Sequence, residues 1–87
     1  MYEVVIGRKA RKNTRKLPPD VLSLFFALVA DLSESGPEQP TWHNFSKLGP
    51  NEYHCPLNYR YVACWTNQNG KLRIEVYYVG SRENAPY

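Results

Sequence analysis

Residues 60–79, RYVACWTNQNGKLRIEVYYV, contain the signal that decides the fold. From Leu72 to Tyr78 apolar and polar side chains alternate, as they do in a strand with one buried and one wet face. The pair Asn69-Gly70 is the dipeptide that most strongly favours a tight hairpin turn. The stretch therefore predicts two antiparallel strands, residues 60–66 and 72–79, joined by a turn over residues 67–70.

The segments before this hairpin extend the sheet and then interrupt it. Residues 53–59 are rich in strand-forming side chains and predict a further strand, which makes the second half of the chain an antiparallel meander. Between residues 38 and 51, two prolines and a glycine break any regular pattern around the isolated aromatic residues Trp42 and Phe45. We expect an irregular loop there, anchored by these two side chains.

A largely buried helix precedes that loop. It begins at the proline pair 18–19, because proline is tolerated in a first turn, and it ends at Gly36, which can adopt a left-handed cap. Its apolar run is far shorter than the ~20 residues needed to cross a bilayer. Four apolar residues at spacings of three and four predict its buried face: Val21, Phe25, Leu28 and Leu32.

The N-terminal segment completes the fold. Residues 2–6 predict a short strand that ends at Gly7, and the basic segment 8–16 predicts a short helix that needs its neighbours for stability. A chain of 87 residues has room for one core. The sequence thus predicts one α+β domain over residues 1–87: a strand, a helical hairpin and three antiparallel strands. The helices should pack on one face of a single sheet and leave the other face free for ligands.

Positive charge is concentrated near the N-terminus. The net charge is +3, and concentrated positive charge attracts polyanions, so we expect a nucleic acid or an acidic protein as partner. A solvated helix face is the plainer alternative for such a charge run. Six of the eleven basic residues fall within nine positions: Arg8, Lys9, Arg11, Lys12, Arg15 and Lys16.

The two cysteines, Cys55 and Cys64, are too few for the disulfide scaffold of a small secreted domain, and we expect reduced thiols. No charged segment followed by an apolar stretch opens the chain, so we expect a cytoplasmic protein. His54 and the two thiols are a weak candidate for a metal site, because a structural zinc needs four ligands and no Cys-x-x-Cys pair exists. We therefore predict neither a metal nor another cofactor.

Four residues on the expected wet face and the segment after it suit phosphate chemistry: His54, Arg60, Arg82 and Tyr87. Guanidinium groups pair with phosphoryl oxygens and stabilise the added charge of a phosphorane-like transition state. Histidine exchanges a proton near neutral pH and suits general acid or base catalysis. The plainer interpretation is a chance group of surface arginines beside a tyrosine that only packs.

Aromatic residues of the meander are candidates for stacking on exposed bases. Because side chains alternate along strands, about half must face the core, so we expect two or three on the wet face. The candidates are Tyr53, Tyr59, Tyr61, Trp65, Tyr77 and Tyr78.

The chain resembles the RelE/ParE superfamily of toxins from type II toxin–antitoxin systems over nearly its whole length. Residues 59–65, YRYVACW, are similar to the family's Tyr-Arg-hydrophobic strand, and residues 79–83, VGSRE, are similar to its Val-Gly-Lys-Arg-Glu strand end. Two positions depart from the pattern: Pro56 stands where a second basic residue is usual, and Tyr87 is one residue closer to Arg82. The C-terminal helix of some relatives has no counterpart in these 87 residues.

The resemblance to the RelE branch implies an mRNA interferase, a ribosome-dependent endoribonuclease that inhibits translation without a metal. It cuts mRNA in the ribosomal A site by attack of a 2′-hydroxyl on the adjacent phosphate. Arg60 would hold that phosphate and Arg82 would stabilise the leaving oxygen. Tyr87 would stack on a base or help to remove the hydroxyl proton, and His54 would act as the base. The residues expected to contact RNA or the ribosome are Arg8, Lys9, Arg11, Lys12, Arg15, Lys16 and Lys47.

The same resemblance implies a cognate antitoxin, an acidic or amphipathic protein that covers the basic surface. Two alternatives stay open at this point. A ParE-type toxin would poison DNA gyrase without catalysis of its own, and a degenerate member would only bind its antitoxin and act as a co-repressor.

Overall fold

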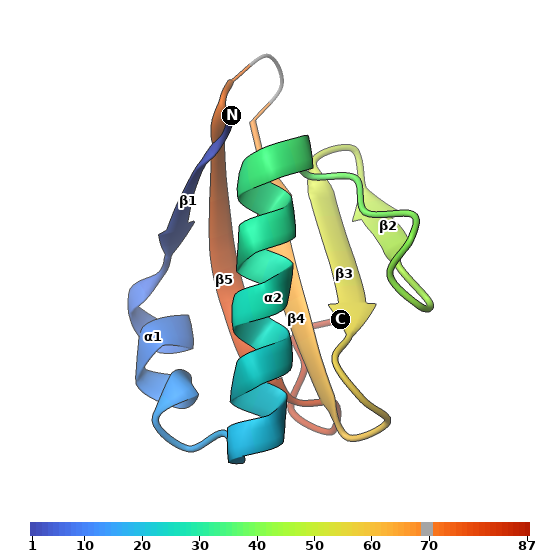
Figure 1. Ribbon diagram of the computed structural model, residues 1–87. Coiled ribbons are helices and arrows are strands. Elements are labelled where there is room, and N and C mark those ends of the chain that lie inside the picture. The colour runs from blue at the N-terminus through green and yellow to red at the C-terminus, as the bar shows by residue number, and fades with distance from the viewer. Residues whose placement is uncertain (69–70) are drawn as a thin grey trace.

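The short turns and apolar alternation of the sequence produce a sheet with one long helix against it in the computed structural model, which describes residues 1–68 and 71–87 (Figure 1). Within those ranges the elements follow the order β1, α1, α2, β2, β3, β4 and β5. Their bounds are β1 Glu3–Ile6, α1 Arg8–Thr14, α2 Pro19–Ser35, β2 Ser46–Gly49, β3 Glu52–Pro56, β4 Tyr61–Asn67 and β5 Arg73–Ser81.

The sheet order is β1-β5-β4-β3-β2. Strands β2 to β5 pair antiparallel with their neighbours, and β1 pairs parallel with β5 at the edge. The predicted α+β fold with a C-terminal meander is confirmed. The predicted Asn69-Gly70 turn lies outside the described residues.

The prediction of a loop throughout residues 38–51 is wrong at one place, because β2 forms there. Strand β2 is exposed at Ser46, Lys47 and Leu48, so it shows none of the apolar alternation by which strands are recognised. Its pairing with β3 joins backbone groups and is irregular between Lys47 and Gly49. Backbone pairing of this kind leaves little trace in the side-chain pattern, which is why the sequence did not indicate the strand.

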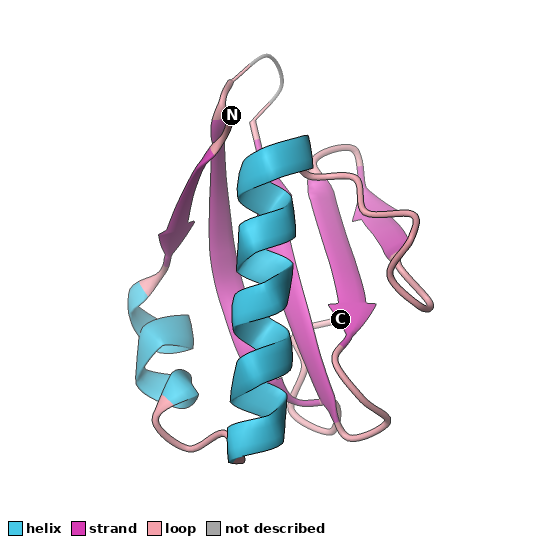
Figure 2. Ribbon diagram, viewed as in Figure 1, coloured by secondary structure: helices cyan, strands magenta, loops and turns pink. Residues whose placement is uncertain are grey.

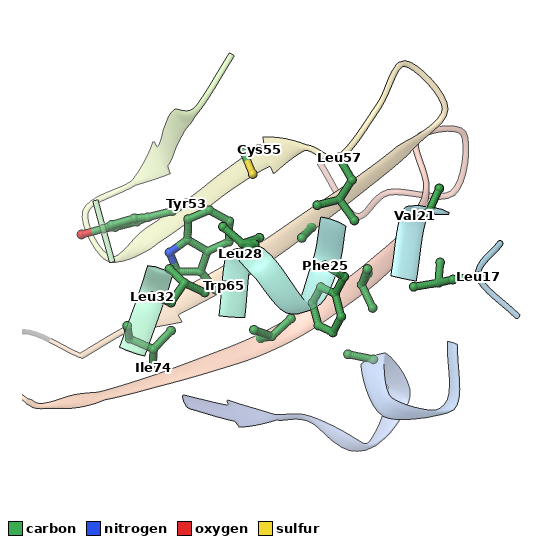
Figure 3. Packing of buried hydrophobic residues seen from close by; sticks show 14 residues of the cluster. Leu17, Val21, Phe25, Leu28, Leu32, Tyr53, Cys55, Leu57, Trp65 and Ile74 are labelled. Carbon is green, nitrogen blue, oxygen red and sulfur yellow. The ribbon is translucent and has the colours of Figure 1, made fainter. Parts of the chain in front are cut away.

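Helix α2 lies across one face of the sheet (Figure 2). Its four predicted core residues are all buried, and they pack with Trp65, Ile74 and other strand residues into one cluster (Figure 3). Gly36 ends the helix with a φ of 98°, the left-handed region that glycine tolerates. A Cβ at that position would also lie 2.9 Å from the Tyr2 ring, so no larger residue fits without strain.

The connection after α2 is held by side chains, as predicted. The Gln39 amide is buried and donates to the carbonyl oxygens of Asp31 and Gly36, which ties the connection to the C-terminal end of α2. The Trp42 indole donates to the Asp31 carboxylate at 2.8 Å, and Phe45 stacks on Trp65 at 6.0 Å between ring centroids. These contacts fix the segment that leads into β2.

Helix α1 lies at the edge of the sheet, beside the half of β5 that β1 does not reach (Figure 1). Ala10 is its one buried residue, and the Asn13 amide donates to the Val79 carbonyl at 3.0 Å. The remaining side chains of α1 are exposed or half-buried, in agreement with the prediction of a short helix supported by its neighbours. Among the described residues, no helix combines the length and apolar character that a membrane span requires.

Candidate active site

Strand alternation places His54 on the sheet face that α2 does not cover. Its neighbours Tyr53 and Cys55 belong to the core beneath α2, so the side chain between them points to the opposite face. Cys64 pairs with His54 across the β3–β4 ladder and shares that face. We call it the open face.

The segment 82–87 folds back over the open face and brings Tyr87 to His54. It turns sharply after β5, where the Asn84 amide donates to Ser81 Oγ at 3.3 Å and the Ala85 amide donates to the Arg82 carbonyl at 3.2 Å. The rings of His54 and Tyr87 then lie 4.6 Å apart between centroids, with their planes tilted by 57°. Figure 1 shows the C-terminal end passing behind the sheet, away from α2.

Arg60 directly precedes β4 and Arg82 directly follows β5, so the two arginines are neighbours at one end of this antiparallel pair. The Arg82 amide donates to the Arg60 carbonyl at 2.7 Å, so the backbone itself holds the two residues together. Asn58 fixes the preceding turn, because its side-chain oxygen accepts from the amides of Arg60 and Tyr61 at 2.8 and 2.9 Å. Both arginines are exposed. They line a cleft of about 590 Å³ with Tyr59, Tyr61, Ser81 and Glu83.

The electrostatics of the site keep His54 neutral. Burial lowers the pKa of the imidazole below its ordinary value of 6.5, and the positive charge of Arg82 lowers it further. Its Nδ1 lies 2.8 Å from Ser46 Oγ. When Nδ1 carries the ring proton, it donates a hydrogen bond to that hydroxyl. Nε2 is then left as a free proton acceptor.

Tyr87 is a neutral phenol in the same surroundings. Burial raises the pKa of its hydroxyl above 10, the nearby Cys64 thiol adds to this, and Arg82 partly opposes it. The same arginine charge thus acts on both rings. At neutral pH His54 is able to accept a proton, whereas Tyr87 is able to donate a hydrogen bond or to stack.

Three of the four predicted chemistry-bearing residues, His54, Arg82 and Tyr87, therefore converge on the open face. The Arg60 backbone is bonded to Arg82, while its guanidinium lies over the Tyr59 ring at 5.8 Å. A basic acceptor beside the Arg82 guanidinium can take a proton from a hydroxyl while the guanidinium stabilises charge on a phosphoryl group. Their catalytic roles stay predictions.

The predicted basic contacts divide between surfaces. All seven side chains are exposed. The six near the N-terminus lie on or next to α1, whereas Lys47 reaches over the Tyr53 ring at 5.7 Å, on the α2 side of the sheet. Lys47 is therefore apart from the His54 cluster. Lys9, Lys12 and Lys16 border hollows of the open face that also touch Tyr78 and Asn84.

The cysteines lie on opposite faces of the sheet. Cys55 belongs to the core beneath α2, and Cys64 is buried on the open face. Burial raises the pKa of both thiols to about 12. For Cys55, the neighbouring Cys64 raises the pKa further. For Cys64, a hydrogen bond with Tyr77 lowers the pKa and the Glu52 charge raises it. Both are free thiols, as predicted. Because His54 and Cys55 point in opposite directions, they do not converge on a shared ion.

A bulge in β5 changes the expected alternation. Cys64 pairs with Tyr78 and Trp65 pairs with Val76, so Tyr77 has no partner across the ladder. Tyr77 and Tyr78 consequently share the open face, where Tyr77 reaches Glu52 and Tyr78 donates to the Ser81 carbonyl at 2.6 Å. Tyr53 and Trp65 are buried in the core beneath α2. The expectation of two or three aromatic residues on this face is confirmed.

Two residues of the site were not indicated by the sequence. Ser46 supports the His54 ring, but it does so through β2, which carries no apolar pattern. Gly80 makes room for its neighbours, since a Cβ there would lie 2.9 Å from the Tyr78 hydroxyl and 3.3 Å from the Asn13 amide nitrogen. The Val-Gly pair of the predicted motif was a usable signal for the second of these.

The architecture is shared with solved toxin structures. The isolated RelE toxin of E. coli superposes with a TM-score of 0.74 at 23% identity, covering 99% of this chain and 89% of that one. The toxin of the archaeal RelE–RelB complex from Pyrococcus horikoshii gives 0.75 at 16% identity, covering 97% and 98%.

The chain has the RelE fold. The YoeB–YefM complex of Staphylococcus aureus contains a further example, with a TM-score of 0.69 at 12% identity over 91% of this chain and 94% of that one. No protein-family model and no curated protein sequence matches. The resemblance to RelE inferred from two short stretches of sequence is thus confirmed in the fold.

Proposed function

We propose that this protein is the toxin of a type II toxin–antitoxin system and that it cleaves mRNA in the ribosomal A site. The observation that carries the proposal is the meeting of His54, Arg82 and Tyr87 on the open face of a RelE fold, with the Arg60 backbone bonded to that of Arg82. The exposed basic side chains of α1 supply the charge that attracts RNA and the ribosome.

The reaction is a transfer within the RNA. The 2′-oxygen of one ribose attacks the adjacent phosphorus, and the bond from phosphorus to the 5′-oxygen breaks. The products are a 2′,3′-cyclic phosphate and a 5′-hydroxyl. His54 Nε2 takes the proton of the 2′-hydroxyl, and the leaving oxygen takes a proton from water. Arg60 and Arg82 neutralise the charge that builds up on the phosphoryl oxygens.

The division of roles between the two rings follows from their pKa shifts. His54 has a lowered pKa and is unprotonated at neutral pH, as a base must be. The raised pKa of Tyr87 favours the intact phenol, so its role is to stack on a base or to donate a hydrogen bond.

The partner in the resting state is an antitoxin with an acidic or amphipathic segment. The RelE and YoeB structures that share this fold include complexes with RelB and YefM. Two oppositely charged surfaces attract less strongly in salt, so raising the ionic strength should weaken the complex. An affinity that does not change with salt would argue against charge as the basis of pairing.

The test of cleavage compares two arginines of the same region. Arg82→Ala removes a site guanidinium, whereas Arg73→Ala removes an exposed one at the other end of β5. Expressed in cells, the wild type and Arg73→Ala should create new mRNA 5′ ends and arrest growth. Arg82→Ala should reduce cleavage by about 10²- to 10³-fold, the usual effect of losing one transition-state donor.

Three results would contradict the proposal. Growth arrest with unchanged mRNA 5′ ends, accompanied by DNA damage, would indicate a gyrase poison. Wild-type activity in the Arg82→Ala variant would show that Arg82 takes no part in the cleavage. Absence of growth arrest on induction would favour a protein that only binds its antitoxin.

A further inference from the structure

A second hollow of the open face lies between α1 and the segment 82–87. Its volume is about 540 Å³, within the range of small-molecule sites. One wall is basic, the floor is aromatic, and the far wall is the segment that carries Tyr87. We call it the α1 groove, and its lining residues are Lys9, Lys12, Asn13, Tyr77, Tyr78, Asn84 and Pro86.

The floor of the α1 groove exists because of the β5 bulge. Tyr77 is the extra residue, and the bulge turns it to the same face as Tyr78 instead of into the core. Both side chains are half-buried, so part of each remains accessible. The Tyr78 hydroxyl is bonded to the Ser81 carbonyl at 2.6 Å, and the Tyr77 hydroxyl reaches the Glu52 carboxylate at 3.4 Å. Rings anchored at their tips lose little freedom when a ligand stacks on them.

The basic wall comes from one stripe of α1. Lys9 and Lys12 are three residues apart, which places both on one side of the helix, facing the groove. Arg8 and Arg11 have the same spacing one residue earlier and do not line it. The charge run therefore forms two stripes, one of lysines that border the hollows of the open face and one of arginines that do not line them.

The charges around the α1 groove orient a bound nucleotide. Glu52 lies at the β3 end of Tyr77, so a phosphate there would meet a carboxylate, whereas the α1 end offers two ammonium groups. A nucleotide with its base over the tyrosines is therefore oriented with its phosphate toward α1. Asn84 and Pro86, which line the groove, belong to the same short segment as Tyr87, whose ring lies beside His54.

We propose that the α1 groove binds one unpaired nucleotide of an RNA strand, with its base on Tyr77 and its phosphate between Lys9 and Lys12. This nucleotide neighbours the one at the His54 cluster, and the assignment rests on the proposed function of that cluster. The groove positions the strand and takes no part in the chemistry.

The stacking is tested with two substitutions at one residue. The probe is a short single-stranded RNA with 2′-O-methyl ribose throughout, which prevents cleavage, and with 2-aminopurine moved through each position in turn. Wild type and Tyr77→Phe should quench the fluorescence of 2-aminopurine at the position that stacks on Tyr77, apart from any position that stacks on Tyr87. Tyr77→Leu should abolish that quenching and weaken binding about fivefold to a hundredfold. Equal quenching in Tyr77→Leu, in a variant with wild-type circular dichroism, would overturn the assignment.

The phosphate contact is tested with adjacent residues on α1. Lys12→Ala should reduce the slope of log affinity against log salt by about 0.7, the value for one lost contact to a single strand. Arg11→Ala removes the same charge from a side chain that does not line the groove and should reduce the slope by less than Lys12→Ala does. Equal reductions in both variants would indicate diffuse attraction and would refute a defined site.

Binding and cleavage are read separately, so the two proposals can fail separately. If mRNA is not cut but Tyr77 and Lys12 control binding of the 2′-O-methyl probe, the groove assignment is supported and the nuclease function is refuted. If mRNA is cut and neither residue affects probe binding, the groove assignment falls and the nuclease function stands.

Discussion

His54 combines partial burial with a nearby guanidinium, and both keep its ring neutral. Removing one of these causes should move its pKa in a known direction. In Arg82→Ala the pKa of His54 should rise toward 6.5, although it should stay below that value because burial is the larger cause. Arg73→Ala should leave it unchanged.

The measurement is an NMR titration of the His54 ring, assigned with the aid of a His43→Gln variant. An unchanged titration in Arg82→Ala would show that the guanidinium does not act on this ring, and the site as described would lose its electrostatic link.

The same lowered pKa makes stability depend on pH. In the unfolded chain His54 takes up a proton near pH 6.5, and in the folded chain it does so at lower pH. As pH falls through this window the unfolded state binds more protons, so the free energy of unfolding decreases. The contribution of neutral His54 to the free energy of unfolding is fully present above pH 6.5, and it is lost once the pH drops below the pKa of His54 in the folded state.

Urea denaturation of wild type and His54→Gln across this range isolates the effect from that of the carboxyl groups. The difference in unfolding free energy between the two proteins should shift in favour of the variant as pH falls below 6.5. A difference that is constant with pH would contradict the assignment.

Among the elements, α2 provides the sharpest contrast between neighbouring side chains. Phe25 is fully buried and Phe26 is 53% exposed. Phe25→Ala should lower the free energy of unfolding by about 3–5 kcal/mol, because it leaves a cavity against the sheet. Phe26→Ala should change it by about 1 kcal/mol or less. Both variants gain the same helix propensity, because each replaces phenylalanine by alanine in the same helix. Urea denaturation of both variants measures the difference, and similar losses would mean that the helix face is assigned incorrectly.

Elements with a local pattern could be predicted from the sequence, and those that depend on distant pairing could not. The buried face of α2 follows from its spacing, and Gly36 marks its end. Strand β2 depends on its pairing with β3, and the bulge at Tyr77 depends on the register of β5 against β4, so no local signal in the sequence indicates either of them.

The candidate site divides in the same way. The residue types that suit phosphate chemistry could be named in advance, because guanidinium groups bind phosphoryl oxygens and imidazole exchanges a proton near neutral pH. Their meeting depends on the return of segment 82–87 across the sheet and on the backbone bond from Arg82 to Arg60. Sequence spacing does not encode either of these contacts.

At the scale of the whole molecule, the sheet is covered on both sides by different means. Helix α2 covers one face, while on the open face Val62 and Cys64 are also fully buried although α2 lies on the other side of the sheet. Tyr87 rests against His54, the cross-strand partner of Cys64, and the Cys64 thiol is close enough to influence the pKa of Tyr87. The segment 82–87 is therefore a third layer of the fold as well as part of the site.

The thiols make this layer measurable. In the full chain, burial and pKa values of about 12 should protect both cysteines from iodoacetamide at pH 8 until the protein is denatured. Deletion of residues 84–87 should expose Cys64 alone, because Cys55 remains beneath α2. Mass spectrometry should then find one modified thiol at Cys64, and none when the deletion is combined with Cys64→Ser. Rapid labelling of the intact chain, or labelling at Cys55 after the deletion, would show that this segment does not cover the open face.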